Sequence, residues 1–252
     1  KISNKMIRKI VNQVMKLKKS SRIKANIRRL QTLDITPNKG SADWLALCEL
    51  KMGGFQTNVT RNKVSDLDPR TETEIMTGGM SGGDRMIHHN YSKVYAKYLS
   101  FFVNKIDNPI ILECGILKGT GLAVWSELFP TAHLIGLDID LNHTKSNLEF
   151  LKSKGAFKNN TLSLLNFDQF SPDTTQLAEL LGSQKLSIII DDGYHDDDTI
   201  LNTLRALKPY FAESFVYFAE DNASVFPMIK NQFPEFTVDS FGQMTVITPL
   251  KK

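Results

Sequence analysis

From residue 108 to the end of the chain, short apolar runs alternate with longer amphipathic segments. Each apolar run has the length of a β-strand, and most segments between them have helical spacing. Buried parallel strands read as continuous apolar stretches, so this alternation predicts a parallel sheet covered by helices on both faces. Strands are expected at 109–114, 132–139, 161–165, 186–191, 214–220, 235–240 and 243–249, and helices at 119–129, 143–155, 174–182 and 198–211.

The last two predicted strands break this alternation. Only Phe241 and Gly242 separate them, which is the length of a β-hairpin turn, so the final strand should run antiparallel. The expected fold is α/β, with a doubly wound, mostly parallel seven-stranded sheet that ends in an antiparallel hairpin. This arrangement resembles the class I methyltransferase fold, whereas the plain nucleotide-binding Rossmann pattern lacks such an ending.

Residues 1–80 follow a different pattern. Apolar positions recur at close to helical spacing within 1–17, while 30–80 is irregular and polar and ends in a glycine-rich stretch. We expect a basic N-terminal helix and a cap over 1–80, and a second unit over 81–252 that holds the sheet. The glycines from 78 to 83 could form a lid in front of the sheet.

Charge is distributed unevenly along the chain. The formal net charge is +4, but residues 1–29 contain eleven Lys or Arg and no Asp or Glu, which leaves the other 223 residues at −7. A solvated helix packed on its own subunit or on a neighbour in a homo-oligomer explains this arm. Anionic lipid, nucleic acid or an acidic partner is the alternative contact. A basic arm on an acidic body is not typical of a dedicated nucleic-acid binder.

Composition indicates an ordinary globular chain. Hydrophobic residues make up 41%, and no apolar run approaches the ~20 residues that span a bilayer. Cys48 and Cys114 are the only cysteines, so no disulfide framework is expected and a cytoplasmic location is the default.

The run from Ile188 to Asp198, IIIDDGYHDDD, carries the main chemical signal. It takes a buried strand directly into five aspartates, and the next predicted strand also ends in two acids. Neighbouring parallel strands lie ~4.8 Å apart, and their carboxyl ends open into one crevice. Four carboxyl groups would converge there, and such a cluster requires a cation. The four are Asp191, Asp192, Glu220 and Asp221.

All-oxygen ligation favours Mg²⁺, Mn²⁺ or Ca²⁺ over zinc. His195 follows the aspartates closely and is the nearby group able to take a proton near neutral pH. A packing or capping role in the turn is the alternative for this imidazole. The aspartates at 196–198 are assigned to the first turn of the next helix, where negative charge suits the helix dipole.

A nucleotide-type cofactor is indicated at the first two strands. Gly115 and Gly119 allow a tight turn and close backbone approach after Glu113, and G-x-G-x-x-G is absent, which counts against NAD. Asp138 ends the second strand, where it could accept both ribose hydroxyls or instead cap the next helix. Asp168 and Gln169, after the third strand, could meet an adenine edge.

Residues 80–240 resemble the metal-dependent macrolide-sugar O-methyltransferases of the mycinamicin and macrocin type. The resemblance is carried by IIIDDGYHDDDTILNTLRALKPYF, VYFAEDN and LECGILKGTG, and by an upstream segment with matching Asp84, Arg85, His89, Tyr91 and Tyr95. Tyr194 stands where that family has Ser, and Arg85 stands where it has Lys.

The resemblance implies an S-adenosylmethionine-dependent O-methyltransferase that acts on a hydroxyl of a sugar or glycoconjugate. It implies Mg²⁺ or Mn²⁺ ligands at Asp192, Glu220 and Asp221, and a general base at His195. Cofactor binding would involve Glu113, Gly115, Gly119, Asp138, Asp168, Gln169, Asp191 and Arg85.

Three other classes of function stay open. A metal-dependent hydrolase could use the same carboxylates and histidine, but would not need Glu113 and Asp138. An oxygenase-like relative of this fold would want a second histidine near the metal, and no histidine follows His195. Within the methyltransferase class, a non-sugar acceptor would keep the same cofactor residues. A non-catalytic interaction protein would explain the basic arm and leave the acidic crevice unexplained.

Overall fold

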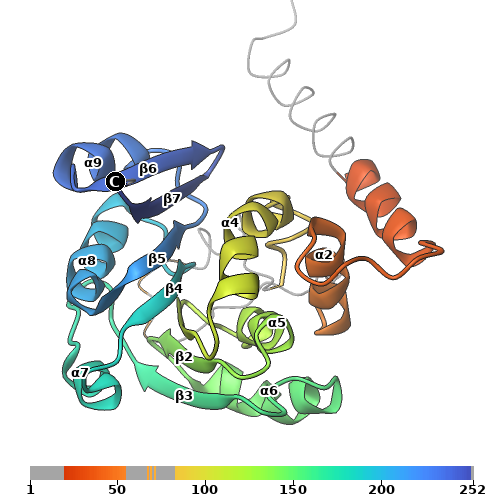
Figure 1. The fold of residues 1–252 in the computed structure, drawn as a ribbon, viewed down its shortest axis with the longest axis horizontal. Coiled ribbons are helices and arrows are strands. Elements are labelled where there is room, and N and C mark those ends of the chain that lie inside the picture. Colours follow the sequence, from red (N-terminus) through yellow and green to blue (C-terminus); the bar gives the residue numbers. More distant parts are fainter. Residues whose placement is uncertain (1–19, 55–66, 68, 70, 72–82, 251–252) are drawn as a thin grey trace, which may run out of the picture.

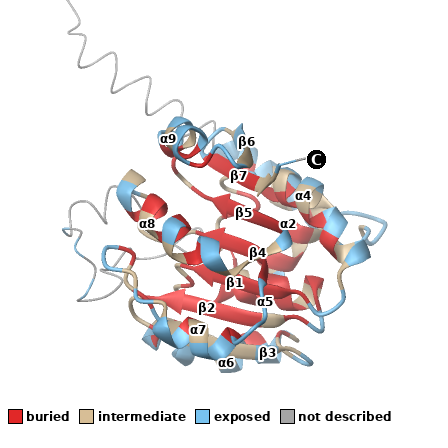
Figure 2. Ribbon diagram, turned by 60° about the vertical axis from the view of Figure 1, so that its left-hand side comes forward, coloured by how far each residue is buried: buried red, intermediate tan, exposed pale blue. Residues whose placement is uncertain are grey.

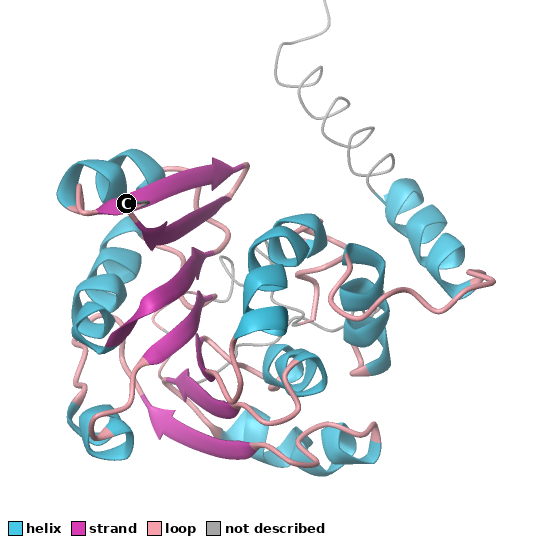
Figure 3. Cartoon of the chain, viewed as in Figure 1, coloured by secondary structure: helices cyan, strands magenta, loops and turns pink. Residues whose placement is uncertain are grey.

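The computed structural model describes residues 20–54, 67, 69, 71 and 83–250. Its centre is a seven-stranded sheet (Figures 1 and 3). The strands are β1 (Ile110–Cys114), β2 (His133–Asp138), β3 (Thr161–Asn166), β4 (Leu186–Asp191), β5 (Phe211–Ala219), β6 (Phe236–Phe241) and β7 (Met244–Pro249). Their order across the sheet is β3-β2-β1-β4-β5-β7-β6. The first five strands pair in parallel and β7 pairs antiparallel to both β5 and β6, so the predicted fold is confirmed.

Helices cover both faces of the sheet (Figures 1 and 2). One face carries α2 (Ala42–Lys51), α4 (Ser92–Lys105), α5 (Thr120–Leu128) and α6 (Asn142–Ser153). The other carries α7 (Thr175–Leu181), α8 (Asp197–Leu207), the 3₁₀ turn η1 (Lys208–Tyr210) and α9 (Val225–Gln232).

Strand β4 shows how one sheet supports two cores. Ile188 and Ile190 face the core shared with α4 and α5, while Ile189 faces the core of α8 and α9, and all three are fully buried. Side chains alternate along a strand, so a strand buried on both faces must be apolar at consecutive positions. This is why β4 has no polar residue between Ser187 and Asp191.

The prediction that residues 30–80 are irregular is wrong at α2. Ser41 caps this helix, since its Oγ accepts a hydrogen bond from the Trp44 backbone N at 3.3 Å. Leu45, Ala46 and Cys48 are buried in the same core as α4 and α5. Because α2 packs on several sides, its apolar residues spread around the helix and give little periodic contrast in the sequence.

Parts of other predictions lie outside the described residues. These include the apolar positions within 1–17 and most of the glycine-rich stretch at 78–83. The described part of the basic arm is helical over 20–31, and Arg29 forms an ion pair with Asp43 at 2.6 Å. Within the described ranges, no helix combines the length and apolarity needed to span a bilayer.

Candidate metal and cofactor site

The carboxyl ends of β4 and β5 lie side by side because these strands pair in parallel. Asp191 is in register with Ala219, so the residues that follow, Asp192 and Glu220, leave the sheet at the same level. The Glu220 backbone N donates to Asp191 O at 2.9 Å, and the Asp192 backbone N donates to Cys114 O at 2.9 Å. The acidic residues of both strands therefore meet at one edge of the sheet.

Three side chains at this edge form a group that could hold a cation. One donor atom each from Asp192, His195 and Asp221 lies within 4.8 Å of the others. His195 and Asp221 have positive φ values of 69° and 57°, a strained conformation that is frequent at binding sites. The buried Nδ1 of His195 has no hydrogen-bond partner. This donor set fits Mg²⁺ or Mn²⁺, and we call these three residues with Glu220 the metal end.

Asp221 is held by two side chains from the segment before α4. Tyr91 donates its hydroxyl to Asp221 Oδ1 at 2.6 Å, and His89 Nδ1 lies 3.0 Å from the same oxygen. Burial raises the pKa of Asp221, but the contacts with His89 and Tyr91 outweigh it and hold the pKa at about 2. Burial likewise lowers the pKa of His89, yet Asp221 and Asp84 raise it to about 10. At neutral pH the first is therefore an anion and the second a cation.

Glu220 points into the protein. It is 1% exposed, its Oε1 lies 2.7 Å from Arg85 Nε, and it accepts a hydrogen bond from the Tyr95 hydroxyl. Burial raises the pKa of Glu220 well above its ordinary value, although Arg85 lowers it. Of the predicted ligand set, the structure thus brings Asp192 and Asp221 to the cluster and turns Glu220 toward Arg85.

Arg85 lies between the acids of three strands. Its Nη2 donates to Glu113 Oε1 at 3.0 Å and to Asp192 Oδ2 at 2.5 Å. Glu113 also accepts a hydrogen bond from Trp125 Nε1 at 2.7 Å, and the guanidinium carbon lies 5.7 Å from the Trp125 ring centroid. Sequence reasoning placed Arg85 only with the cofactor residues. Its contacts with the predicted metal ligands depend on packing that no local motif reports.

Asp191 and Gln169 brace the turn beneath the metal end. Asp191 is 1% exposed and accepts hydrogen bonds from Gln169 Nε2 at 2.7 Å and the Tyr217 hydroxyl at 2.6 Å. Burial raises its pKa to about 6. The Gln169 Nε2 also contacts Thr203 Oγ1 at 2.8 Å, and its Oε1 accepts from the Tyr194 backbone N at 2.8 Å. Both polar atoms of the Gln169 amide are therefore engaged within the protein.

The turn after β1 is the first part of what we call the cofactor end. Gly115 has φ 83°, and a β-carbon there would lie 2.1 Å from the carbonyl oxygen of Asp192. Asp138, at the end of β2, accepts hydrogen bonds from the backbone N of Leu117 at 2.9 Å and of Asp140 at 3.1 Å. Burial raises the pKa of Asp138. This carboxylate therefore holds the turn at 115–119 against β2.

The remaining predicted cofactor residues occupy turns. Gly119 precedes α5 with φ 75°. Asp168 follows β3, and its Oδ1 accepts a hydrogen bond from the Phe170 backbone N at 2.9 Å. The cofactor end consists of Glu113, the turn at 115–119, Asp138 and a neighbouring cavity.

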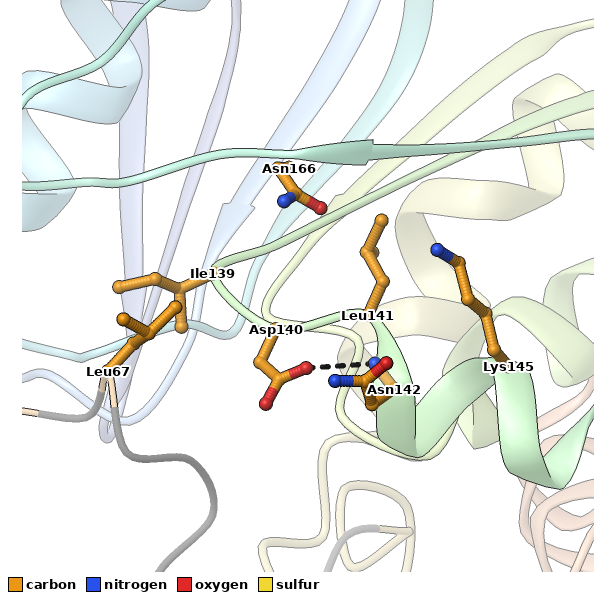
Figure 4. A pocket seen from close by; sticks show the side chains of 7 residues that line it. All are labelled: Leu67, Ile139, Asp140, Leu141, Asn142, Lys145 and Asn166. Carbon is orange, nitrogen blue, oxygen red and sulfur yellow. Dashed lines mark hydrogen bonds between the residues drawn. The ribbon is translucent and has the colours of Figure 1, made fainter.

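This cavity of about 300 Å³ lies where β2 and β3 end and α6 begins (Figure 4). Its walls combine three apolar side chains with amides, a carboxylate and an amine, a mixture suited to a nucleoside. Asp140 Oδ1 accepts a hydrogen bond from the Asn142 backbone N at 2.9 Å. The lining residues are Leu67, Ile139, Asp140, Leu141, Asn142, Lys145 and Asn166.

No family model matches the chain, and no curated protein matches it. A provisionally named O-methyltransferase from Klebsiella pneumoniae is 14% identical with a TM-score of 0.52, over 93% of this chain and 99% of that one. The mycinamycin-pathway methyltransferase MycE, solved with Mg, S-adenosylhomocysteine (SAH) and mycinamycin VI, is 16% identical with a TM-score of 0.49. That match covers 63% of this chain and 49% of MycE, about half its length. An rRNA methylase from Streptococcus thermophilus is 10% identical with a TM-score of 0.46, over 63% of this chain and 96% of that one.

At identities this low, a structural likeness shows the fold alone. The activity has to be argued from the site. The strand order, the antiparallel final hairpin and the match over nearly the whole chain agree. The chain has the class I methyltransferase fold.

Proposed function

We propose that the chain is an S-adenosylmethionine-dependent O-methyltransferase that uses a divalent cation and methylates a hydroxyl of a sugar or glycoconjugate. The observation that carries this proposal is the position of the Asp192–His195–Asp221 group at the strand ends of a class I methyltransferase fold. The cofactor end with its nucleoside-sized cavity belongs to the same edge of the sheet.

The cofactor would lie along the ends of β1, β2 and β3. The cavity beside Ile139 suits the adenine, Asp138 suits the ribose hydroxyls, and Glu113 suits the ammonium group of the methionine part. Asp138 is 9% exposed and Glu113 is 1% exposed. Both carboxylates already accept hydrogen bonds within the protein, so cofactor contacts would add to these bonds or replace them.

The cation would be held by Asp192 and Asp221. When bound, it would supply positive charge that lowers the pKa of an acceptor hydroxyl and orients two vicinal oxygens. Mg²⁺ typically takes one or two carboxylates and keeps its other positions for water and substrate. Two ligands at this site therefore suit an acceptor that offers two adjacent oxygens.

His195 would take the proton from the acceptor hydroxyl. Asn222 Nδ2 donates to the His195 carbonyl oxygen at 2.9 Å and fixes the turn, while Nε2 lies 3.6 Å from Asp192 Oδ1. The imidazole side chain is 23% exposed, so an acceptor can reach it. Once its proton is removed, the hydroxyl oxygen would be the nucleophile for the sulfonium methyl group that a bound cofactor supplies, with the carbon–sulfur bond broken and SAH as the leaving group.

Three measurements on the purified protein test the proposal. SAH should bind in calorimetry, Mg²⁺ or Mn²⁺ should bind separately, and labelled methyl groups should pass from S-adenosylmethionine to a sugar hydroxyl. An unchanged rate of methyl transfer after EDTA treatment would contradict the metal requirement. A product methylated on nitrogen or on an isolated phenol would contradict the sugar acceptor, and absent SAH binding would favour a hydrolase.

A further inference from the structure

A single guanidinium serves three carboxylates in this crevice. Arg85 is 5% exposed, and Glu113 and Glu220 are each 1% exposed, so these ionisable groups are almost fully removed from water. Arg85 Nη2 contacts Glu113 and Asp192, while Nε lies 2.7 Å from Glu220 Oε1. The Nε contact is an electrostatic one, because Nε forms no well-directed hydrogen bond. A buried charge persists only when other charges or dipoles compensate it.

The surroundings of Arg85 restrict its movement. Both carboxylate oxygens of Glu49 accept hydrogen bonds from the backbone N of Met86, at 3.1 and 3.0 Å. A β-carbon on Gly121 would lie 2.3 Å from Arg85 Nη1, so the guanidinium fills its space tightly. The Trp125 ring adds a cation–π contact. Arg85 is thus fixed in place from its backbone to its guanidinium.

Glu220 is bound to the same side chain that contacts the metal end. Its Oε1 faces Arg85 and also accepts the Tyr95 hydroxyl, while Tyr95 itself is fully buried. Glu220 is absent from the group of donor atoms formed by Asp192, His195 and Asp221. To join a cation there, Glu220 would have to give up Arg85, and the buried guanidinium would lose one of its three partners.

We propose that Arg85 is a positioning residue that withholds Glu220 from the divalent cation and so leaves the cation to Asp192 and Asp221. This inference rests on the metal site of the proposed function. Its consequence is a weaker site with coordination positions left open for the acceptor. Arg85 acts in two ways: its charge repels the cation, and its contacts occupy a carboxylate that could otherwise coordinate.

Direct binding of Mn²⁺, followed by electron paramagnetic resonance and calorimetry, tests this inference without any turnover. Glu220→Gln should change the affinity of the otherwise unaltered protein by less than ~3-fold, because Glu220 is not a ligand there. Arg85→Met should raise the affinity roughly tenfold or more, since a cation is removed and a carboxylate is released. The double variant Arg85→Met/Glu220→Gln should lose most of that gain.

Two milder variants cover the case in which Arg85→Met does not fold. Arg85→Lys keeps the charge but cannot span three carboxylates with one compact ammonium. Tyr95→Phe keeps every charge and removes one donor from Glu220. Each should tighten Mn²⁺ binding ~2–5-fold, and Glu220→Gln should abolish both gains. Arg29→Met, at the exposed pair with Asp43, is the matched control and should leave Mn²⁺ affinity unchanged.

Unchanged or weaker Mn²⁺ binding in folded Arg85 and Tyr95 variants would overturn the inference. A loss beyond ~10-fold on Glu220→Gln alone would do the same, because Glu220 would then be a ligand. SAH affinity, measured on the same samples, separates this failure from that of the proposed function. Mn²⁺ binding without SAH binding would contradict the methyltransferase and leave the Arg85 result to stand. If the unaltered protein binds no Mn²⁺, binding by Arg85→Met supports the inference that Arg85 withholds Glu220. If Arg85→Met binds no Mn²⁺ either, the inference is overturned.

Discussion

At the metal end, the carboxylates at the ends of β4 and β5 are held by side chains from a distant part of the chain, residues 84–95. At the cofactor end, the Asp138 carboxylate is instead bound by the backbone N–H groups of nearby residues. Arg85, His89 and Tyr91 bind the acids at the ends of β4 and β5. At the cofactor end, Asp138 and Gly115 shape one short turn. The metal end should therefore respond mainly to changes of charge, and the cofactor end to changes of shape.

The largest expected effect comes from Gly115→Ala, because Gly115 is where the two ends touch. The new β-carbon would lie 2.1 Å from the Asp192 carbonyl oxygen, and φ is 83°. Positive φ costs about 1–2 kcal/mol, and forced overlap adds about 1–3 kcal/mol. Unfolding in urea should show the combined loss, and both SAH and Mn²⁺ binding should weaken.

Gly242→Ala is the matched control for that substitution. Gly242 has φ 69°, but nothing lies within 4 Å of a β-carbon built there. It should show only the cost of positive φ, about 1–2 kcal/mol, with both ligands still bound. Equal losses of stability in the two variants would mean that the contact between Gly115 and Asp192 relaxes freely, and the two ends would then be independent.

His195→Gln should have the next largest effect, mainly on turnover. Loss of a general base lowers kcat by ~10²–10⁴. Because the cofactor end has no contact with this imidazole among the hydrogen bonds described, SAH affinity should stay the same. His133→Gln, on the opposite end of β2 where His133 contacts Ser163, is the control and should keep its kcat. If the His195 variant keeps nearly its full kcat, His195 has a structural role in the turn and does not transfer the proton.

Local patterns were sufficient to predict the strands and the acids at their ends. A buried parallel strand requires consecutive apolar residues, as in Ile188–Ile190, and parallel pairing then brings Asp192 and Asp221 to one edge. The three partners of Arg85 come from strands β1, β4 and β5 or the residues that follow them. Contacts between segments so far apart in the chain produce no recognisable local pattern in the sequence. The direction in which the Glu220 side chain points could therefore not be predicted.

Asp191 shows the same limit in a second way. Strand pattern alone places both Asp191 and Asp192 in the crevice, and only the family resemblance assigned Asp192 to the metal and Asp191 to the cofactor. In the structure the side chains of a strand alternate between faces, so these two neighbours point to different surroundings. Asp191 meets Tyr217 and Gln169, while Asp192 meets Arg85 and His195. The strand was predicted with its observed bounds, Leu186–Asp191, but the partners of each aspartate come from other elements and could not be predicted from β4 alone.

Asp138→Asn should give an intermediate effect confined to the cofactor end. An amide cannot accept hydrogen bonds with both of its polar atoms, so the backbone N of Leu117 or Asp140 would lose its partner. An unsatisfied buried donor costs about 1–3 kcal/mol. SAH affinity should fall roughly tenfold, with Mn²⁺ affinity unchanged. Asp173→Asn is the control, because this exposed carboxylate also accepts a hydrogen bond from a backbone N, that of Thr175. A parallel loss of Mn²⁺ affinity would contradict the separation of the two ends.

The smallest effect concerns Glu49, which supports the metal end from beneath. This buried carboxylate accepts hydrogen bonds from Met86, the residue after Arg85. Burial raises its pKa to about 8, although Arg85 and the backbone of Met86 and Ile87 lower it. In the unfolded chain the pKa is about 4.3. Between these values the folded state binds more protons than the unfolded state, so stability must fall as pH rises from about 4.3 to 8.

Glu49→Gln should remove this slope, because an amide does not titrate. Urea unfolding at intervals from pH 5 to 8 should show the unaltered protein losing stability as the pH rises, with a shallower slope in the variant. Glu127→Gln is the control and should keep the slope. Glu127 forms an exposed ion pair with Lys51, which lies on the same helix as Glu49. If the slopes of Glu49→Gln and the unaltered protein coincide, Glu49 is ionised in the folded state. The segment that carries Arg85 would then be held by a buried anion on α2. The dependence of the metal end on charge would in that case include this helix.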